Sequence, residues 1–317
     1  MNFDILSIRK PILSCFCFGY ARYQEHFFLF EYKNVFITYY LHPSMKTCKV
    51  LGSPLGDKKN FSIAIDVFLS KFPFAHFYGI SEDITLFLKK HGYYLNLFGY
   101  ESHINLNSFK LSWSKTSYLK RQLSKTSHLH VKEVSYDQFL CLNLEKLNNE
   151  WLCKKKSSVF FKFLVRPLSV TNQSFVRCFI AYDGNKIVGY RLFDPIFKNQ
   201  KIIGFYASVS RYDVSIKYSV STKILLSALA VFSKEGKSTL SLGLSPFDGI
   251  SLIQGNFFVS ILFYLINIFS YPFSYKYLAK YKSHFTSQKC LRYVAFKEHI
   301  PYRGILETYL LMRGFYD

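Results

Sequence analysis

The sequence has few of the cysteine patterns that mark metal centres or disulfide scaffolds. Its seven cysteines are scattered, odd in number and without a Cys-x-x-Cys pair or a histidine at ligand spacing. We therefore expect no zinc site, no disulfide framework, no metal and no cofactor, and a reducing compartment. A catalytic thiol would need a recognisable Cys/His partner, so small core residues are the favoured role. The cysteines are Cys15, Cys17, Cys48, Cys141, Cys153, Cys178 and Cys290.

Long apolar runs are also missing. The longest, at residues 257–271, ends at Pro272 and falls short of the ~20 residues needed to cross a bilayer. A shorter run at residues 12–18 is flanked by Pro11 and Gly19 and has no cleavage site. We therefore predict a first strand or helix there rather than a secretory signal.

Acidic residues are scarce. The chain has 20 Asp and Glu residues against 41 Lys and Arg residues, which gives a formal net charge of +21. Solubility does not require such an excess, so it favours an anionic partner, either nucleic acid or an acidic membrane surface. An AT-rich genome would also raise the share of Lys, Phe and Tyr, although it need not suppress acidic residues.

No linker-like or low-complexity segment divides the 317 residues, which are enough for two ordinary domains or one large domain. In the first half, short runs of alternating apolar residues predict strands at 27–32, 35–41 and 93–97. Helical spacing predicts helices at 61–72 and 80–91, and the second of these stops at a Lys-Lys-His-Gly sequence.

The second half repeats this order of elements. The pattern predicts helices at 136–153 and 220–236 and strands at 175–182, 186–193, 202–210 and 239–244. Two layers of similar order indicate an α/β protein with two tightly packed domains. We place these domains at residues 1–130 and 131–317.

One segment of the second half carries the strongest functional signal. Residues 237–247 read KSTLSLGLSPF, with leucines that alternate as in a strand with one buried face. Gly243 allows another backbone or a ligand to approach this strand closely. The longer run 233–247 resembles a signature of the phosphatidylglycerol lysyltransferase C-terminal domain family.

Other motifs of this family follow in the same order. Segments that resemble them lie at 50–56, 98–111, 180–190, 281–285 and 292–293. Each motif is degenerate by itself, so the evidence is their common order over roughly residues 18 to 297.

The resemblance implies tandem acetyltransferase-like (GNAT) folds with mixed central sheets flanked by helices. It implies an aminoacyl-tRNA-dependent transferase whose donor is an aminoacyl-tRNA and whose acceptor is a lipid head group or another small hydroxyl or amine. An anionic phospholipid or membrane surface is then a partner. We expect a cytoplasmic protein, or one bound peripherally at the inner face of the membrane, without the membrane-embedded domain that many members carry.

Two other functions fit the same fold. An acyl-CoA-dependent N-acyltransferase would need a pyrophosphate-binding loop, of the Arg/Gln-x-x-Gly-x-Gly/Ala type, that the sequence does not clearly contain. A catalytically inactive binding protein would keep the fold and its basic surface. Arg211 matches a family motif and argues for activity, whereas Ser208 replaces the aspartate of the same motif and argues against it.

The candidate catalytic residues are Arg211, Asp213 and Glu101. Arg211 and Asp213 precede a helix expected to begin near Ser219, whose N-terminus could supply backbone donors to a developing oxyanion. A surface ion pair is the alternative explanation. Glu101 is the acidic residue of a first-half family motif and could orient an amine or serve the structure.

The candidate substrate-binding residues are Ser208, Gly243, Ser245, Lys282 and Arg292. Ser208 stands where lysine-specific members have an acidic residue in the donor pocket, so the resemblance implies a neutral or small aminoacyl group rather than lysyl. Gly243 and Ser245 belong to the Gly-x-Ser-Pro turn. Lys282 and Arg292 would contact a phosphate or an adenine, or form part of a solvated basic surface.

A basic stretch with interleaved aromatic residues predicts contact with RNA. Its cations are Lys115, Lys120, Arg121 and Lys125, and a solvated helix face explains them about equally well. Residues 256–282 join an apolar run to several Tyr and Lys residues. Such a segment suits a membrane interface with its cations toward anionic head groups, or a buried core helix.

Overall fold

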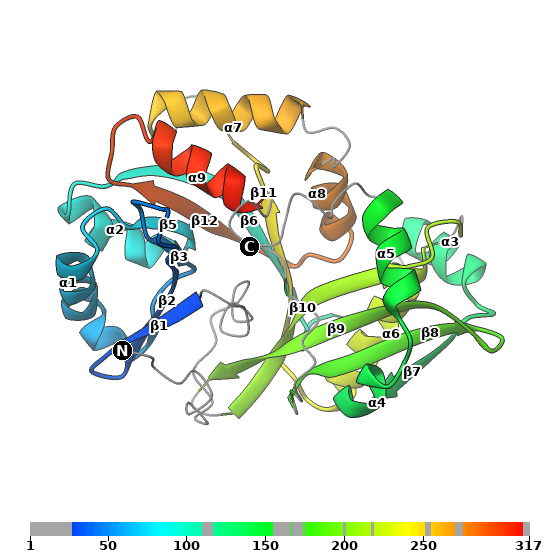
Figure 1. Cartoon of the computed structure of the whole chain (residues 1–317). Helices are drawn as coiled ribbons and strands as arrows, with labels where there is room; N and C mark the ends of the chain where they lie inside the picture. Colours follow the sequence, from blue (N-terminus) through cyan, green and yellow to red (C-terminus); the bar gives the residue numbers. More distant parts are fainter. Residues whose placement is uncertain are drawn as a thin grey trace.

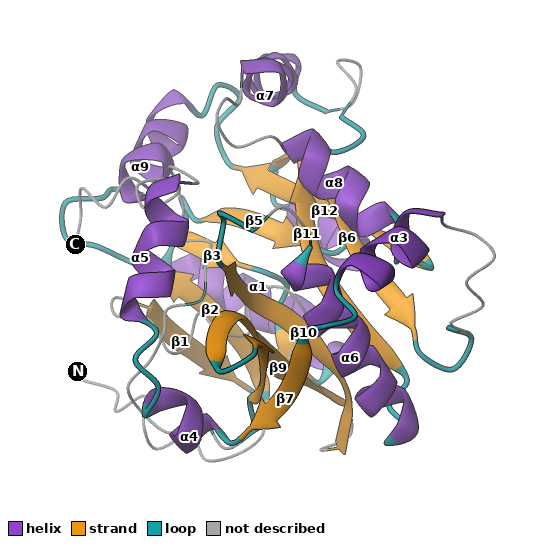
Figure 2. Cartoon of the chain, turned by 90° about the vertical axis from the view of Figure 1, so that its right-hand side faces the viewer, coloured by secondary structure: helices purple, strands orange, loops and turns teal. Residues whose placement is uncertain are grey.

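The computed structural model describes residues 27–109, 117–154, 166, 173, 175–198, 201–216, 219–250, 255–269 and 275–312. They form one twelve-stranded mixed sheet with helices on both faces (Figure 1, Figure 2). This arrangement confirms the predicted α/β class. The element expected at residues 12–18 lies outside the described residues.

The first half contains both predicted helices and a hairpin. Its elements are β1 (Phe27–Tyr32), β2 (Val35–Tyr40), β3 (Lys49–Leu51), β4 (Leu55–Gly56), η3 (Lys58–Asn60), α1 (Phe61–Lys71), β5 (His76–Ile80), α2 (Glu82–Lys90) and β6 (Tyr94–Asn105). Lys33 and Asn34, with φ of 46° and 60°, form the left-handed turn between β1 and β2. The strand β5 was not predicted because it is buried on both faces and shows no alternation.

The second half contains the predicted strands in the predicted order, with α3 (Ser117–Lys125) and β7 (His130–Val134) as elements that were not predicted and with one predicted helix divided in two. Its other elements are α4 (Tyr136–Leu140), α5 (Glu145–Lys154), β8 (Arg177–Asp183), β9 (Lys186–Lys198), β10 (Lys201–Tyr212), α6 (Val220–Lys234) and β11 (Thr239–Pro246). The prediction of one helix at 136–153 was wrong, because the chain breaks between α4 and α5. Asn143 lies in that break, and asparagine is unfavourable in helix interiors because its side chain competes for backbone hydrogen bonds. The next residue, Leu144, is buried.

The last described strand pairs with strands of the first half. The remaining elements are α7 (Phe257–Phe269), α8 (Tyr275–Ser283), β12 (Gln288–Phe296) and α9 (Tyr302–Met312). The strand β12 lies between β5 and β6 and is antiparallel to both. The sheet order is β1-β2-β3-β5-β12-β6-β11-β10-β9-β8-β7, with β4 paired to β2. The strands of both halves therefore belong to one sheet, and the boundary near residue 130 stays a prediction.

Apolar side chains fill both faces of this sheet. The helix α6 packs its buried face, including Leu229 and Phe232, against β8 to β11, and the rings of Phe205 and Phe232 stack 4.3 Å apart. On the other half of the sheet, Phe263 of α7 and Tyr275 of α8 pack around Phe247. These contacts hold α8 against β11, where the predicted site residues gather.

Candidate functional site

The parallel strands β10 and β11 separate halfway along their length. They pair only through Gly204–Tyr206 and Thr239–Ser241, although β10 continues to Tyr212 and β11 to Pro246. Register shifts lie at the same level, in β10 after Ala207 and in β11 after Ser241. Separated strands leave backbone groups without ladder partners, and such groups can bind a ligand or a side chain.

Gly243 and Lys282 lie at this separation. Gly243 has φ of 77°, and a Cβ built there would lie 2.8 Å from Cε2 of Tyr206, so a side chain would be strained. Lys282 of α8 is buried, and its Nζ donates to the carbonyl of Leu244 at 2.7 Å. Ser245 follows on β11, and its buried Oγ has no partner among the described residues. The sequence-predicted residues 243, 245 and 282 are thus close together.

Glu101 and Arg292 form the centre of a buried polar cluster. Glu101 on β6 is 0% exposed, and its Oε2 accepts from Nε of Arg292 on β12 at 2.8 Å. Its Oε1 accepts from Oγ of Ser241 at 2.6 Å and lies 3.4 Å from Nε2 of His103. The sequence prediction named Glu101 and Arg292 separately, and the structure brings them into contact.

The charges of this cluster stabilise one another. Burial alone would raise the pKa of Glu101, but the Arg292 guanidinium and the His103 ring lower it to about 2. Burial alone would lower the pKa of His103, but hydrogen bonds with Cys290 and Glu101 raise it to about 9. At neutral pH the cluster therefore holds a carboxylate beside an imidazolium. Glu101 is a weak base here, and its geometry suits positioning rather than proton abstraction.

Arg211 lies on the α5 side of β10. Its guanidinium stacks over Trp151 at 4.2 Å from the ring centroid, and its Nε donates to Oδ1 of Asn148 at 3.1 Å. Its Nη1 donates to the carbonyl of Ser210 at 3.1 Å. Burial lowers the pKa of this guanidinium, but the ordinary value is high enough to keep it charged. The result is a fixed, mostly buried cation near the end of β10.

Asp213 has different surroundings from Arg211. Its carboxylate accepts from Nζ of the exposed Lys186 at 2.9 Å and from the hydroxyl of Ser215. The Ser215 and Lys186 hydrogen bonds lower the pKa of Asp213 to about 2. Ser208 is half-buried, and its Oγ donates to the carbonyl of Leu192 at 3.3 Å.

The start of α6 contacts α3. Ser219 caps α6 by accepting from the amide of Thr222, and its own amide donates to the Oε1 of Gln122 at 3.1 Å. The predicted nucleic-acid residues Lys120, Arg121 and Lys125 are all exposed on α3. Lys115 lies outside the described residues. The expected helix N-terminus near Ser219 is therefore confirmed, with a basic helix beside it.

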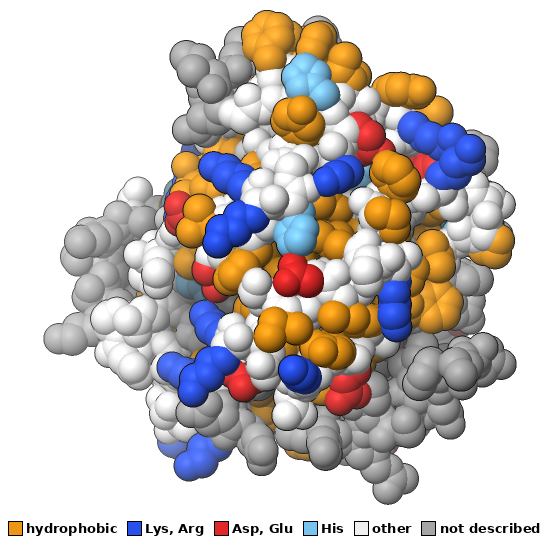
Figure 3. Space-filling view, turned by 90° about the vertical axis from the view of Figure 1, so that its left-hand side faces the viewer, with side chains coloured by type: hydrophobic (Ala, Val, Ile, Leu, Met, Phe, Trp, Pro, Cys, Tyr) orange, Lys and Arg blue, Asp and Glu red, His pale blue; other side chains and the backbone are white. Residues whose placement is uncertain are grey.

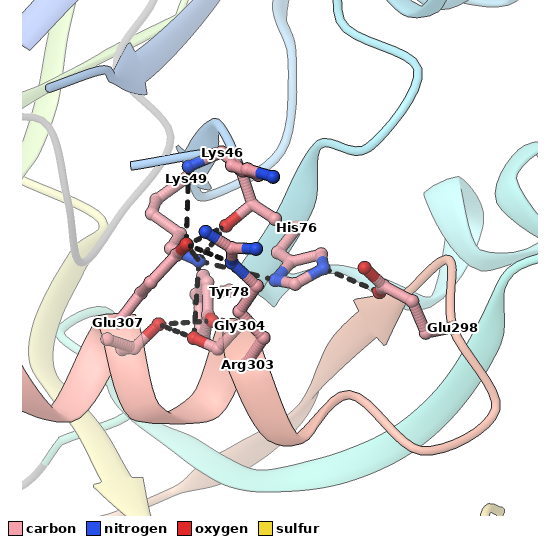
Figure 4. A network of polar contacts seen from close by, with 10 residues as sticks. Lys46, Lys49, His76, Tyr78, Glu298, Arg303, Gly304 and Glu307 are labelled. Atoms are coloured by element: carbon pink, nitrogen blue, oxygen red, sulfur yellow. Dashed lines mark hydrogen bonds and ion pairs between the residues drawn. The ribbon is translucent and has the colours of Figure 1, made fainter. Parts of the chain in front are cut away.

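A second buried network ties α9 to the sheet (Figure 4). Lys49 on β3 is 0% exposed, and its Nζ lies 3.0 Å from Oε2 of Glu307 and 3.2 Å from the carbonyl of Gly304. His76 on β5 lies 2.7 Å from Glu298 through Nε2. Sequence reasoning missed this network because its members come from distant segments. The helix α9 is held in place by charge as well as by apolar packing.

An exposed apolar surface lies on α7 and α9. Phe257 and Phe258 are 60% and 50% exposed, and Leu306 is also exposed. Figure 3 shows hydrophobic side chains gathered at the top of the molecule, where α7 lies. Val259 and Phe263 are buried, so α7 is half core helix and half surface helix. Among the described residues, no helix is both long and apolar enough to cross a bilayer.

Comparison with known proteins agrees with this architecture. The model of the family "Phosphatidylglycerol lysyltransferase, C-terminal" matches residues 14–296. The chain belongs to this family. A phosphatidylglycerol lysyltransferase of Bacillus subtilis is 22% identical over an alignment of 271 residues that covers 79% of this chain and 30% of that protein. The chain thus spans less than a third of this curated relative.

Solved structures of the same family share the fold. The structure of L-PGS from Bacillus licheniformis has a TM-score of 0.76 at 16% identity, with 94% of this chain and 91% of that chain covered. A C-terminal DUF2156 domain from Agrobacterium fabrum has a TM-score of 0.74 at 17% identity, with 93% and 90% covered. Both similarities confirm the expected fold of a mixed central sheet flanked by helices.

Proposed function

We propose that this chain transfers an aminoacyl group from an aminoacyl-tRNA to the head group of an anionic lipid. The observation that carries the proposal is the separation of β10 and β11, with Arg211 on one strand and Lys282 bound to the other. Membership of the phosphatidylglycerol lysyltransferase family supports this choice of reaction. Relatives that carry this name support the lipid acceptor.

The chemistry needs a fixed cation more than a strong base. A lipid hydroxyl attacks the carbonyl of the aminoacyl ester, a new ester bond forms, and the ribose hydroxyl leaves with a proton. Negative charge develops on the carbonyl oxygen during this step. Arg211 can stabilise it without reorganisation, because Trp151 and Asn148 already fix its guanidinium.

Two surfaces of different chemistry flank the separated strands. The exposed cations of α3 suit the phosphates of RNA, and the exposed apolar residues of α7 and α9 suit the edge of a bilayer. The helix α8 lies between α7 and α3 in both views (Figure 1, Figure 2). A donor and a lipid could thus approach from different sides of α8.

A transfer assay tests the proposal. The purified chain is mixed with phosphatidylglycerol vesicles and tRNA charged with radiolabelled amino acids, and the lipid phase is counted. We expect label in the lipid that depends on Arg211 and is lost in Arg211→Ala. A parallel reaction with labelled acyl-CoA tests the alternative donor. Label that enters lipid or amine acceptors only from acyl-CoA, or from neither donor, would overturn the proposal.

Vesicle binding tests the lipid surface separately. Replacing Phe257 and Phe258 by Ser should weaken sedimentation with anionic vesicles severalfold, because both rings are exposed. A matched control replaces Phe74, between α1 and β5, and Leu86 on α2, which are 56% and 64% exposed. If both double variants bind equally well, α7 is not the membrane surface.

A further inference from the structure

Cys290 and His103 lie next to the Glu101–Arg292 pair, and the proposed transfer assigns no role to this thiol or this imidazole. On β12 and β6, Cys290 pairs with Glu101 and Gln288 pairs with His103 in an unbroken antiparallel register. Residues directly opposite one another in such a pair, and residues two apart on one strand, point to the same face of the sheet. The Cys290 thiol and the His103 ring therefore share a face, and they are hydrogen-bonded.

The imidazole of His103 is in turn held by a carboxylate. Nε2 of His103 lies 3.4 Å from Oε1 of Glu101, and Glu101 is fixed by Arg292 and Ser241. The thiol thus contacts the imidazole, and the imidazole contacts the carboxylate. The same order of contacts is found in sites where a base activates a cysteine and a third group orients the base. The arrangement depends on β12 lying next to β6, so no local sequence motif reveals it.

The charge on His103 favours the thiolate of Cys290. His103 is protonated at neutral pH, since its pKa is raised to about 9. Its hydrogen bond lowers the pKa of Cys290 against the opposing effect of burial. Arg292 acts in the same direction, and Glu101 acts in the opposite direction. In contrast, burial raises the pKa of Cys178 to about 12.

Exposure also distinguishes Cys290 from the other cysteines. Cys48 and Cys178 are buried, Cys141 and Cys153 are exposed, and Cys290 is half-buried. Cys290 is thus more exposed than Cys48 and Cys178, and a small reagent has better access to it than to this buried pair. Among the described cysteines, Cys290 combines access with a cationic hydrogen-bond donor.

We propose that Cys290 is a reactive thiolate and a modification site for small electrophiles, with hydroperoxides as the oxidising class. In the oxidation, the Cys290 sulfur attacks one peroxide oxygen, an S–O bond forms and the O–O bond breaks. Sulfur is oxidised by two electrons to a sulfenic acid, and the other oxygen leaves as water or an alcohol with a proton from His103. The product lies beside the Glu101–Arg292 pair. This inference is independent of the proposed function.

The test is residue-specific alkylation of the whole chain by iodoacetamide between pH 6 and pH 9, followed by peptide mass spectrometry. Cys141 and Cys153 serve as internal controls in the same sample. Differences in accessibility that do not depend on pH change the ratio of the Cys290 rate to the control rates by a constant factor. The change of this ratio with pH therefore reports the difference in thiolate fraction. We expect this ratio to rise from pH 9 to pH 6, because a thiol whose pKa is lowered keeps a larger fraction of thiolate at low pH than the controls do.

His103→Gln keeps a polar side chain but removes the titratable ring. In this variant the ratio should become nearly independent of pH, and labelling of peroxide-treated protein by dimedone at Cys290 should fall severalfold. Cys290→Ser should abolish that labelling. A wild-type ratio that stays constant from pH 6 to pH 9 overturns the proposal, and that measurement needs no variant to fold. An unchanged profile in folded His103→Gln would equally overturn the role of the imidazole.

Discussion

Glu101 and Arg292 form a buried ion pair across the neighbouring strands β6 and β12, with Nε and Oε2 2.8 Å apart. These residues lie 191 positions apart in the sequence. Their contact joins β12, the last strand that the structure describes, to β6 of the first half. Because both side chains are almost fully buried, neither charge can be solvated if its partner is lost.

Removing Arg292 should therefore destabilise the protein strongly. Arg292→Met leaves the Glu101 carboxylate buried without its main partner, which should cost about 3–5 kcal/mol of unfolding free energy. Urea denaturation followed by circular dichroism measures the effect. The control is Lys58→Met, which breaks the exposed pair with Asp83 and should cost at most about 1 kcal/mol. Equal midpoints for the two variants would show that the buried pair is not important for stability.

Acid should destabilise the fold within a defined range of pH. The pKa of both Glu101 and Glu307 is lowered from 4.5 to about 2 in the folded protein. Their stabilising effect is thus complete above the ordinary value of 4.5 and is lost as the pH falls toward 2. We expect denaturation midpoints to drop between pH 5 and pH 2. The drop should be smaller in Glu307→Gln, and the exposed Glu82→Gln should follow the wild type.

Local elements were predictable because their signals are local. The helix α6 and the strand β11 were predicted from apolar spacing and from a glycine stop, and Gly236 has the left-handed φ of 70° that such a stop requires. The position of β12 between β5 and β6 was not predictable, because it depends on pairing between distant segments. His103 and Cys290 were missed for the same reason. Spacing alone could have shown that Glu101 and His103 share one face of a strand.

The basic helix α3 should contribute to binding of tRNA. Replacing Lys120, Arg121 and Lys125 by Ala should weaken binding and reduce the slope of log K against log salt by about 2 to 3, because each lost phosphate contact changes the slope by roughly 0.7–0.9. A filter-binding series from low to high salt measures this. The matched control removes three exposed lysines far from α3, at positions 58, 89 and 90. If both triple variants change the slope equally, tRNA binding depends on the net charge of the protein and α3 has no specific role in it.

Arg211 and Asp213 should differ in their importance for catalysis. Arg211→Lys keeps the charge but loses the planar group that stacks on Trp151, so kcat should fall at least about tenfold. Asp213→Asn should keep most of the activity, because this carboxylate already binds Ser215 and the exposed Lys186. Thermal unfolding of each variant separates loss of catalysis from loss of fold. A fully active Arg211→Lys enzyme would contradict the role assigned to the guanidinium.

Ser208 should set the choice of amino acid in the donor. It lies at the register shift where β10 leaves β11, and family resemblance places an acidic residue at this position in lysine-specific members. A lysyl ammonium would lack a charged partner here, and such a charge-assisted bond contributes about 1.5–3 kcal/mol, or roughly ten- to a hundredfold. We expect a neutral or small aminoacyl group to be preferred, and Ser208→Asp to shift preference toward lysyl. Ser210→Asp is the control, because Ser210 contacts Ser221 at the start of α6 instead. In a competition between lysyl-tRNA and neutral aminoacyl-tRNAs, clear preference for lysyl by the natural protein would refute this assignment.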